Sequence, residues 1–391
     1  MSKWKKLTIL CLAFALLLPT LALPTLAKER TELATPPTVS AQSAILVEAD
    51  SGAAVYEKRC DTPMPMASTT KIMTALVALK LCAPETPITV DPSAVGVEGS
   101  SIYLTAGESL TLEQLLYALL LESANDAAVA IAVGVSGSVE AFAEEMNRQA
   151  TALGLTDTHF TNPHGLDDEN HYTTARELAT VTREALREPL FRTIVSTRKT
   201  TIPHASPENV RLLINHNKLL RLYDGCIGVK TGFTKRSGRC LVSAAERDGV
   251  TLIAVTIQAP DDWNDHAALF DYGFSKFTSV LLCDEAGHLY PLTVVNGRDA
   301  YVMVCNDVPL RVTLPIGHGQ ILCTVELPRF AYAPVTKNAP VGKAVFRCDT
   351  DGDGKAEIIG EAVLTACYTV EKRETKRSFW QWLRDLFARF L

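Results

Sequence analysis

Ser68-Thr69-Thr70-Lys71, Ser123-Ala124-Asn125 and Lys230-Thr231-Gly232 are the three short segments that decide the fold class and the chemistry of this sequence. Residues 66–80 are rich in Ala, Leu and Met, so we expect a helix that places Ser68 and Lys71 on one face. A serine hydroxyl is a poor nucleophile at neutral pH unless a neighbouring base takes its proton, and a lysine shielded from water can be that base. Each segment alone is common. All three in this order indicate a lysine-activated serine nucleophile.

The size and composition of the chain suit an exported enzyme. Its 391 residues are many for one domain, which predicts two domains with additional terminal segments. Hydrophobic residues make up 47% of the chain, enough to build substantial cores. The formal net charge of −6 gives no reason to expect nucleic acid as a partner.

Residues 1–27 have the pattern of a secretory signal peptide. Three lysines precede an apolar run from Leu7 to Leu18, and Thr25-Leu26-Ala27 places small residues at the −3 and −1 positions of a cleavage site. An uncleaved membrane anchor is the alternative, but the apolar run is short for a span and two prolines follow it closely. We expect residues 28–42 to be a polar, proline-bearing tether.

The ten cysteines do not form a recognisable site. Cys11 lies in the signal peptide, and the nine others include no Cys-x-x-Cys spacing that would indicate zinc or a redox centre. Several stand in apolar runs, where a free thiol behaves as a small hydrophobe. A disulfide framework remains the alternative. We predict no bound metal and no cofactor.

Residues 43–280 have the pattern of one α/β (α+β) domain. Four strands are expected as two hairpins, Ala44–Ala49 with Ala53–Tyr56 and Gly238–Glu246 with Val250–Ile257. Helices are expected over Leu112–Leu121, Asp126–Val135, Thr174–Arg187 and Asp265–Tyr272, with capping boxes opening at Thr111 and Thr174. Strands at both ends with helices between them predict a sheet closed from the two termini of the domain.

Residues 281–370 predict a small all-β domain, because short strand-like runs are separated by Gly, Pro, Asn and Asp. Within it, the acidic segment from Asp349 to Gly354 resembles the opening of a calcium loop. However, the twelfth position of that loop is Gly360 rather than Glu, and no flanking helices are expected. A hairpin turn is the preferred interpretation.

Residues 371–391 predict a basic amphipathic helix. They carry six basic and three acidic side chains on an otherwise acidic protein. One helical face holds Phe379, Leu383, Leu386, Phe387 and Phe390, with Trp380 and Trp382 at its margins. Such a helix suits an anionic bilayer surface, so we expect residues 378–391 to anchor the protein peripherally on the outer face of the membrane across which it is exported. A terminal helix docked on its own domain is the alternative.

The surroundings of the three segments resemble those of the D-alanyl-D-alanine carboxypeptidases, which are low-molecular-mass penicillin-binding proteins. The matching stretches are Met66–Ala75, Glu122–Ala128, Asn162–Leu166, Tyr172–Arg176, Gly228–Thr234 and Asp271–Phe274. The resemblance spans the chain, including the signal peptide, the β domain and the terminal helix. It implies a penicillin-binding/β-lactamase-like transpeptidase fold, removal of the terminal D-alanine from peptidoglycan stem pentapeptides, and covalent inhibition by β-lactam antibiotics.

The resemblance also implies roles for individual residues. Ser68 would be the nucleophile, Lys71 its proton acceptor and Ser123 a proton relay to the leaving nitrogen. The implied substrate-binding residues are Asn125, Lys230, Thr231, Gly232 and Phe233. Asn125 would bind the substrate peptide, Lys230 and Thr231 its terminal carboxylate, and the backbone N–H groups of Ser68 and Phe233 the oxyanion. Phe233 stands where relatives often carry a polar residue. His164 and His216 are interpreted as structural.

Two other functions compete with this one. A class A β-lactamase shares the three segments but deacylates through a glutamate, and no asparagine between Asn125 and Lys230 has a glutamate four residues before it. A catalytically weak penicillin-binding scaffold protein is the second alternative. The intact serine, lysine and asparagine residues of the three segments argue against it.

Overall fold

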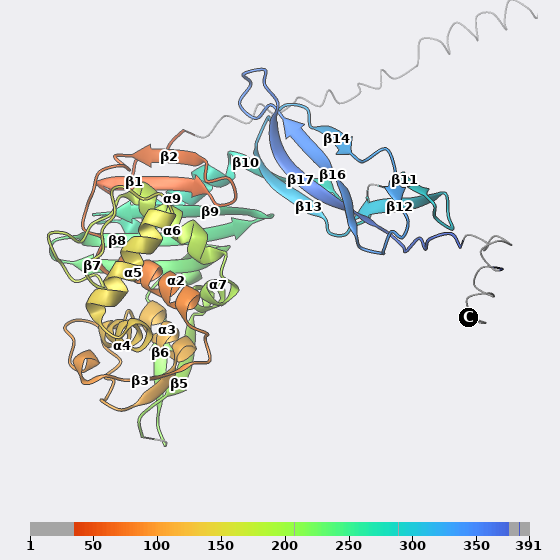
Figure 1. Cartoon of the computed structure of the whole chain (residues 1–391). Helices are drawn as coiled ribbons and strands as arrows, with labels where there is room; N and C mark the ends of the chain where they lie inside the picture. The colour runs from red at the N-terminus through yellow and green to blue at the C-terminus, as the bar shows by residue number, and fades with distance from the viewer. Residues whose placement is uncertain (1–34, 207, 288, 375–382, 384–391) are drawn as a thin grey trace, which may run out of the picture. The chain divides into compact units, whose positions relative to one another are not determined.

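The computed structural model describes residues 35–206, 208–287, 289–374 and 383 (Figure 1). The predicted signal peptide, the first part of the predicted tether and, apart from Leu383, the predicted helix over 378–391 lie outside the described residues. No single helix in the described ranges is long and apolar enough to cross a membrane. Only α4 (Asn125–Ser136) and α5 (Val139–Ala152) reach that length and composition as a pair, and they are bent by 84°.

A five-stranded antiparallel sheet organises the first part of the described chain (Figure 1). Its order is β2-β1-β9-β8-β7, built from Ala54–Lys58, Ser43–Glu48, Val250–Ile257, Gly238–Arg247 and Cys226–Thr234. The N-terminal strand β1 pairs with β9 along its whole length, from Ser43 opposite Ile257 to Glu48 opposite Leu252. Both predicted hairpins and the sheet closed from two termini are therefore confirmed.

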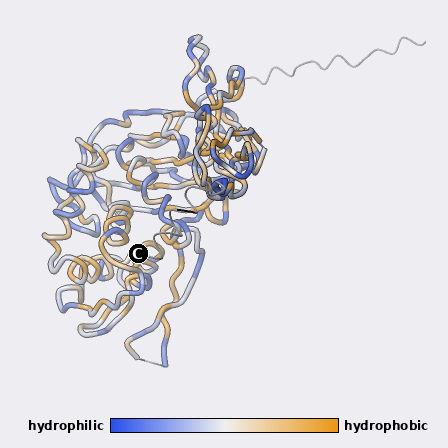
Figure 2. The backbone as a smooth tube through the Cα atoms, turned by 45° about the vertical axis from the view of Figure 1, so that its right-hand side comes forward, coloured by the Kyte–Doolittle hydropathy of each residue, from blue (hydrophilic) through white to orange (hydrophobic). Residues whose placement is uncertain are grey.

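Helices cover both faces of this sheet because the side chains of its central strands are apolar on both sides. On β9, Ile253 and Val255 join the large core formed with α2, α3, α4 and α6, whereas Leu252 and Ala254 join the smaller core under α9. The helices are α2 (Lys71–Leu81), α3 (Leu112–Leu121), α6 (Ala175–Leu186), α7 (Pro189–Ser196), α8 (Leu219–Leu222) and α9 (Asp262–Phe274). Apolar and polar residues follow one another at short intervals along most of the coloured backbone (Figure 2).

Two expected helix starts differ from the structure in an informative way. The helix predicted from residue 66 begins as a 3₁₀ turn, η1 (Ala67–Thr70), and becomes α-helical only at Lys71. Thr111 forms the complete predicted capping box with Gln114. At Thr174 only half of the predicted box forms: its hydroxyl accepts the N–H of Glu177. The Glu177 carboxylate instead accepts N–H groups of residues 156 and 157, which ties α6 to the preceding loop.

Several elements were not predicted. They are the helices α5, α7 and α8, the 3₁₀ turn η2 (Pro92–Ala94) and the two-stranded pairs β3 (Pro87–Thr89) with β4 (Ser109–Thr111) and β5 (Lys199–Pro203) with β6 (Val210–Ile214). The predicted α4 helix begins one residue earlier than expected, at Asn125, and α9 begins at Asp262 rather than Asp265.

Residues 277–366 form strands only, as far as the structure describes them, which confirms the predicted all-β character of this part of the chain. One sheet has the order β14-β16-β17-β12-β11-β15, and β10 pairs with β13 in a second one. The strands are β10 (Phe277–Cys283), β11 (Tyr290–Val295), β12 (Tyr301–Asn306), β13 (Leu310–Pro315), β14 (Leu322–Glu326), β15 (Ala331–Tyr332), β16 (Pro340–Cys348) and β17 (Glu357–Ala366). The segment from Asp349 to Gly354 joins the antiparallel pair β16–β17, as the predicted hairpin turn requires.

Candidate active site

The structure brings the three segments together at one cleft of about 380 Å³. Ser68 lies on η1, Ser123 at the junction of α3 and α4, and residues 230–233 on the edge strand β7. The cleft is lined by Ser68, Ser100, Ser123, His216, Lys218, Thr231, Gly232, Phe233, Arg239, Asp262 and Trp263. Lys71, Asn125 and Lys230 are buried, with 0%, 4% and 1% of their surface exposed, so they act from inside the protein.

The backbone beside both hydroxyl groups is in an unfavourable conformation. Ala67, immediately before Ser68, has a φ of 48°, and Ser123 has a φ of 61°. Non-glycine residues in this left-handed region cost energy and are held there by their surroundings, and such residues cluster at functional sites. The surrounding structure therefore holds Ala67 and Ser123 in a backbone conformation that their own preferences disfavour.

Lys71 is the centre of the hydrogen-bond network. Its Nζ lies 2.9 Å from Ser68 Oγ, 2.7 Å from Asn125 Oδ1 and 2.6 Å from the carbonyl oxygen of His164. Burial, and then the nearby charge of Lys230, hold the pKa of Lys71 well below its ordinary value. A neutral amine has two N–H groups and one lone pair. If the two carbonyl oxygens take these N–H groups, the lone pair is left for Ser68 Oγ, as the predicted role of Lys71 as proton acceptor requires.

Both the oxygen and the nitrogen of the Asn125 side-chain amide are hydrogen-bonded. Its oxygen accepts from Lys71, its Nδ2 donates to the carbonyl oxygen of Glu98 at 2.5 Å, and its backbone N–H donates to Ser100 at 2.7 Å. Sequence reasoning assigned this amide to the substrate, and that role stays a prediction. The contacts in the structure orient the lysine.

Sequence reasoning gave no role in the site to the loop that supplies the other acceptor for Lys71. The carbonyl of His164 reaches the amine, while burial lowers the pKa of the His164 ring to about 3. The loop is fixed to the nucleophile segment by Thr74 Oγ1, which donates to Pro163 O at 2.6 Å, and by Thr70 Oγ1, which lies 2.8 Å from His171 Nε2. A backbone carbonyl has no side-chain signature, so only the matching stretch Asn162–Leu166 pointed to this loop.

Lys230 is poised between its charged and neutral forms. Burial lowers its pKa to about 7, and its Nζ donates to the carbonyl oxygen of Thr231 at 2.8 Å. Within the described residues, no hydrogen bond joins the Ser123 hydroxyl to Lys71 or Lys230. The predicted relay through Ser123 therefore stays a prediction that requires a bound substrate to complete the contacts.

Four further residues of the cleft lining, His216, Arg239, Asp262 and Trp263, were given no part in the chemistry by the sequence. His216 Nε2 lies 3.2 Å from Glu122 Oε2, and burial, followed by the charge of Lys230, lowers the pKa of this histidine against the opposing effect of Glu122. Arg239 donates to Asp262 at 2.7 Å and lies over the ring of Trp263, 5.6 Å from its centroid. These side chains lie at the cleft, and none of them is among the hydrogen-bond partners of Lys71 Nζ in the described residues.

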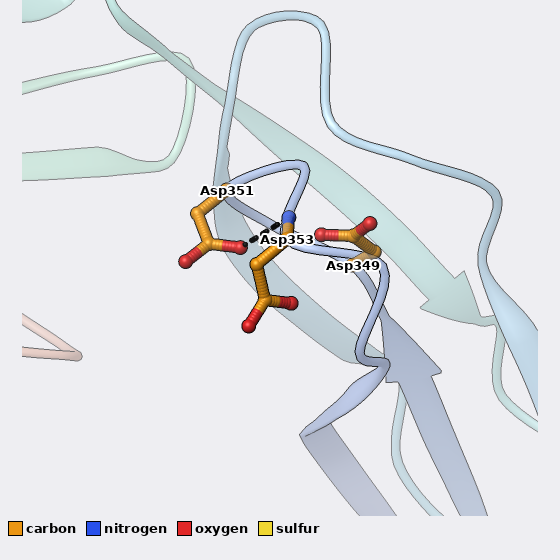
Figure 3. Close-up of side chains that lie close together, drawn as sticks. All are labelled: Asp349, Asp351 and Asp353. Carbon is orange, nitrogen blue, oxygen red and sulfur yellow. Dashed lines mark hydrogen bonds between the residues drawn. The ribbon is translucent and has the colours of Figure 1, made fainter.

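The candidate metal ligands lie elsewhere in the chain. Figure 3 shows Asp349, Asp351 and Asp353 in the β16–β17 turn, where one ligand atom of each lies within 4.8 Å of the others. Backbone N–H groups of the turn already occupy these carboxylates: Gly352 and Gly354 donate to Asp349, and Asp353 donates to Asp351. Hydrogen bonding within the turn accounts for the arrangement without an ion.

Comparisons with known proteins agree with this geometry. The sequence model of the D-alanyl-D-alanine carboxypeptidase family matches residues 30–261. The D-alanyl-D-alanine carboxypeptidase DacF of Bacillus subtilis (strain 168) is 28% identical over 342 residues, which cover 85% of this chain and 86% of the relative. DacA of Escherichia coli (strain K12), which has the same description, is 32% identical over 339 residues, covering 80% and 81%. The crystal structure of penicillin-binding protein 5 from Haemophilus influenzae aligns with a TM-score of 0.63 at 29% identity, covering 87% of this chain and 100% of that one.

The fold and the contact between Ser68 and the buried Lys71 thus define a serine peptidase of the penicillin-binding type. The chain belongs to the D-alanyl-D-alanine carboxypeptidase family, as the resemblance of its motifs predicted. It is a serine-type D-Ala-D-Ala carboxypeptidase.

Proposed function

We propose that the protein removes the terminal D-alanine from peptidoglycan stem pentapeptides through an acyl-enzyme on Ser68. The observation that carries this proposal is the 2.9 Å separation between Ser68 Oγ and Lys71 Nζ, in a site where burial holds the pKa of the amine well below its ordinary value. A neutral lysine next to a serine is what a nucleophilic hydroxyl needs at neutral pH.

The residues divide the reaction between them. Lys71 accepts the proton of Ser68 as its oxygen attacks the carbonyl carbon between the two D-alanines. The backbone N–H groups of Ser68 and Phe233 hold the negative charge that develops on the carbonyl oxygen. When the C–N bond breaks, the leaving amine takes a proton from Lys71 through Ser123, and the terminal D-alanine departs. Water then attacks the Ser68 ester and releases the shortened peptide.

The edge strand β7 is suited to hold the substrate backbone, because its outer edge is free of strand partners in this sheet. Lys230 and Thr231 at this edge would bind the terminal carboxylate of the peptide. Gly232 keeps the strand close to the nucleophile: a Cβ there would lie 3.1 Å from the backbone nitrogens of Ser68 and Thr69, tighter than an ordinary contact. Phe233 is 67% exposed, which leaves its side chain available to the incoming peptide.

The substrate places this enzyme outside the cytoplasmic membrane, where peptidoglycan is built. The predicted signal peptide supplies the export route, and the predicted basic helix over 378–391 supplies peripheral attachment to the membrane surface. β-Lactams, which acylate nucleophiles of this type, would be covalent inhibitors through Ser68.

Replacing Ser68 with alanine tests the proposal. We expect Ser68→Ala to abolish both labelling by a fluorescent penicillin and release of D-alanine from a pentapeptide, with the thermal unfolding midpoint retained. Lys71→Ala should be nearly as severe. Labelling that persists in Ser68→Ala, or that locates to another serine, would refute the assignment. A wild-type label that is lost within seconds would favour the β-lactamase alternative instead.

A further inference from the structure

Two cysteines of the all-β part of the chain face one another at close range. Cys305 lies on β12, and Cys367 is the first residue after β17. Cys367 Sγ donates to Cys305 Sγ at a separation of 2.9 Å. We propose that these two residues form a disulfide in the exported protein, closing a loop between positions 62 residues apart.

The backbone already holds both residues in place for this bond. In the antiparallel pair, Cys305 stands opposite Thr365 on β17, so Cys367 is its diagonal neighbour. The backbone N–H of Cys367 continues the ladder by donating to Met303 O at 2.9 Å. Side chains in diagonal positions are ordinarily farther apart than directly opposite ones. Here the chain bends at residues 367–368, and the two sulfur atoms are 2.9 Å apart. A disulfide needs a separation of about 2.05 Å, a remaining approach of less than about 1 Å.

Three other thiols among the described residues have backbone carbonyl oxygens as their hydrogen-bond partners. Cys226 donates to the carbonyl oxygen of Gly228 at 3.4 Å, and Cys348 donates to that of Gly319 at 3.3 Å. Cys240 is buried with 1% of its surface exposed, and its sulfur faces the carbonyl of Ser237. Each of these thiols has the surroundings of a reduced packing group. Cys305 and Cys367 are only half-buried, so an external oxidant can reach them.

The oxidation balances through thiol–disulfide exchange with a disulfide of an oxidoreductase or of a small thiol. The Cys367 thiolate attacks the carrier disulfide, forms a mixed disulfide and expels one carrier thiolate. Cys305 then attacks Cys367 Sγ, which forms the Cys305–Cys367 bond and expels the second carrier thiolate. Two protein thiols lose two protons and two electrons, and the carrier disulfide is reduced to two thiols. The hydrogen bond shared by the two thiols, with burial, raises the pKa of Cys305 to about 11, so the exchange is slow without a catalyst at neutral pH.

The position of the pair indicates what the bond stabilises. Beyond Cys367 the chain is held by backbone hydrogen bonds, from Val370 N to Val335 O and from Arg373 N to Asn296 O, both at 2.8 Å. These bonds lie between the sheet and the predicted membrane-binding residues. A disulfide at Cys367 would keep the start of this segment joined to β12 even when those bonds open. It would also restrict the unfolded chain, which is how disulfides stabilise in the chain-entropy account.

The test uses the mature full-length protein, equilibrated in buffers of increasing glutathione disulfide to glutathione ratio. Free thiols are then alkylated under denaturing conditions, and peptides are mapped without reduction. We expect a linked Cys305–Cys367 peptide and two fewer alkylated cysteines. Cys305→Ser and Cys367→Ser should each abolish the linked peptide, and Cys348→Ser, the matched control at a buried thiol, should retain it.

A second readout keeps the inference separate from the proposed catalytic function. The oxidised protein should unfold at higher denaturant concentration than the reduced one, whereas the rate of penicillin labelling should be equal in both. Absence of the linked peptide at every glutathione ratio would overturn the inference, as would a link from either cysteine to a third one. Loss of penicillin labelling in both redox forms, with the linked peptide present, would instead count against the proposed function.

Discussion

Replacing Gly165 with alanine should disable acylation while leaving the protein folded. Gly165 has a φ of +89°, and a Cβ added to it would lie 2.5 Å from the carbonyl carbon of Ala67 and 2.9 Å from Thr70 Oγ1. Non-bonded carbon atoms approach to about 3.5 Å, so the loop must retreat by about 1 Å. The residue before it, His164, holds the Lys71 amine through its carbonyl oxygen.

The expected loss follows from that displacement. The Lys71–His164 hydrogen bond, now 2.6 Å, would lengthen to about 3.6 Å, beyond the hydrogen-bonding limit of about 3.2 Å. A misplacement of about 1 Å in a catalytic group can reduce a rate roughly 100-fold. We therefore expect the acylation rate constant to fall by roughly 10- to 100-fold. Placing alanine in the left-handed region adds a stability cost of about 1–2 kcal/mol.

Gly154→Ala is the matched control. Gly154 also has a positive φ, +75°, but a Cβ there would meet no atom within 4 Å. It should carry the same backbone cost and acylate at the wild-type rate. The assay is the rate of labelling by a fluorescent penicillin, with a thermal unfolding curve for each variant. Wild-type labelling by a folded Gly165→Ala protein, or an equal loss in Gly154→Ala, would refute the reasoning.

Three further predictions concern binding, pH and the membrane. Lys230→Ala should weaken peptides with a free terminal carboxylate more than amidated analogues, by the roughly 1.5–3 kcal/mol of a charged hydrogen bond. Equal losses in kcat/KM would exclude carboxylate binding. Because burial lowers the pKa of Lys230 from 10.5 to about 7, the unfolded state binds the extra proton between these values, and stability should rise with pH there. Lys230→Met should flatten that rise in denaturant titrations. Removing residues 377–391 should release the protein from sedimented membranes while D-alanine release continues, and a truncated protein that still sediments would contradict the anchor.

Most strands and helices could be predicted, because their hydrophobic patterns and capping residues agree with the burial that they have in the structure. The strands β1, β8 and β9 are apolar on both faces, and α3 starts at a complete capping box, so hydrophobic pattern and end signals predicted them. At Thr174 only one of the two hydrogen bonds of the predicted capping box forms, because the Glu177 carboxylate accepts an N–H group from a loop 21 residues earlier in the chain. The pair β5–β6 was missed because β6 exposes three apolar residues, Val210, Leu212 and Ile214, and buries Arg211, so it lacks the alternation expected of a half-buried strand.

By itself the sequence determined which residue types the reaction uses and the order in which they occur. Acyl transfer demands a hydroxyl, a base and a cation, and side chains with those properties stand at Ser68, Lys71 and Lys230 whatever surrounds them. Only the tertiary structure decided which groups orient Lys71 and what lowers its pKa. The acceptors that orient Lys71 lie 54 and 93 residues away, and one of them is a backbone carbonyl. The burial that lowers the pKa of this lysine is a property of the packed core, since exposure to water is fixed by residues distant in the chain.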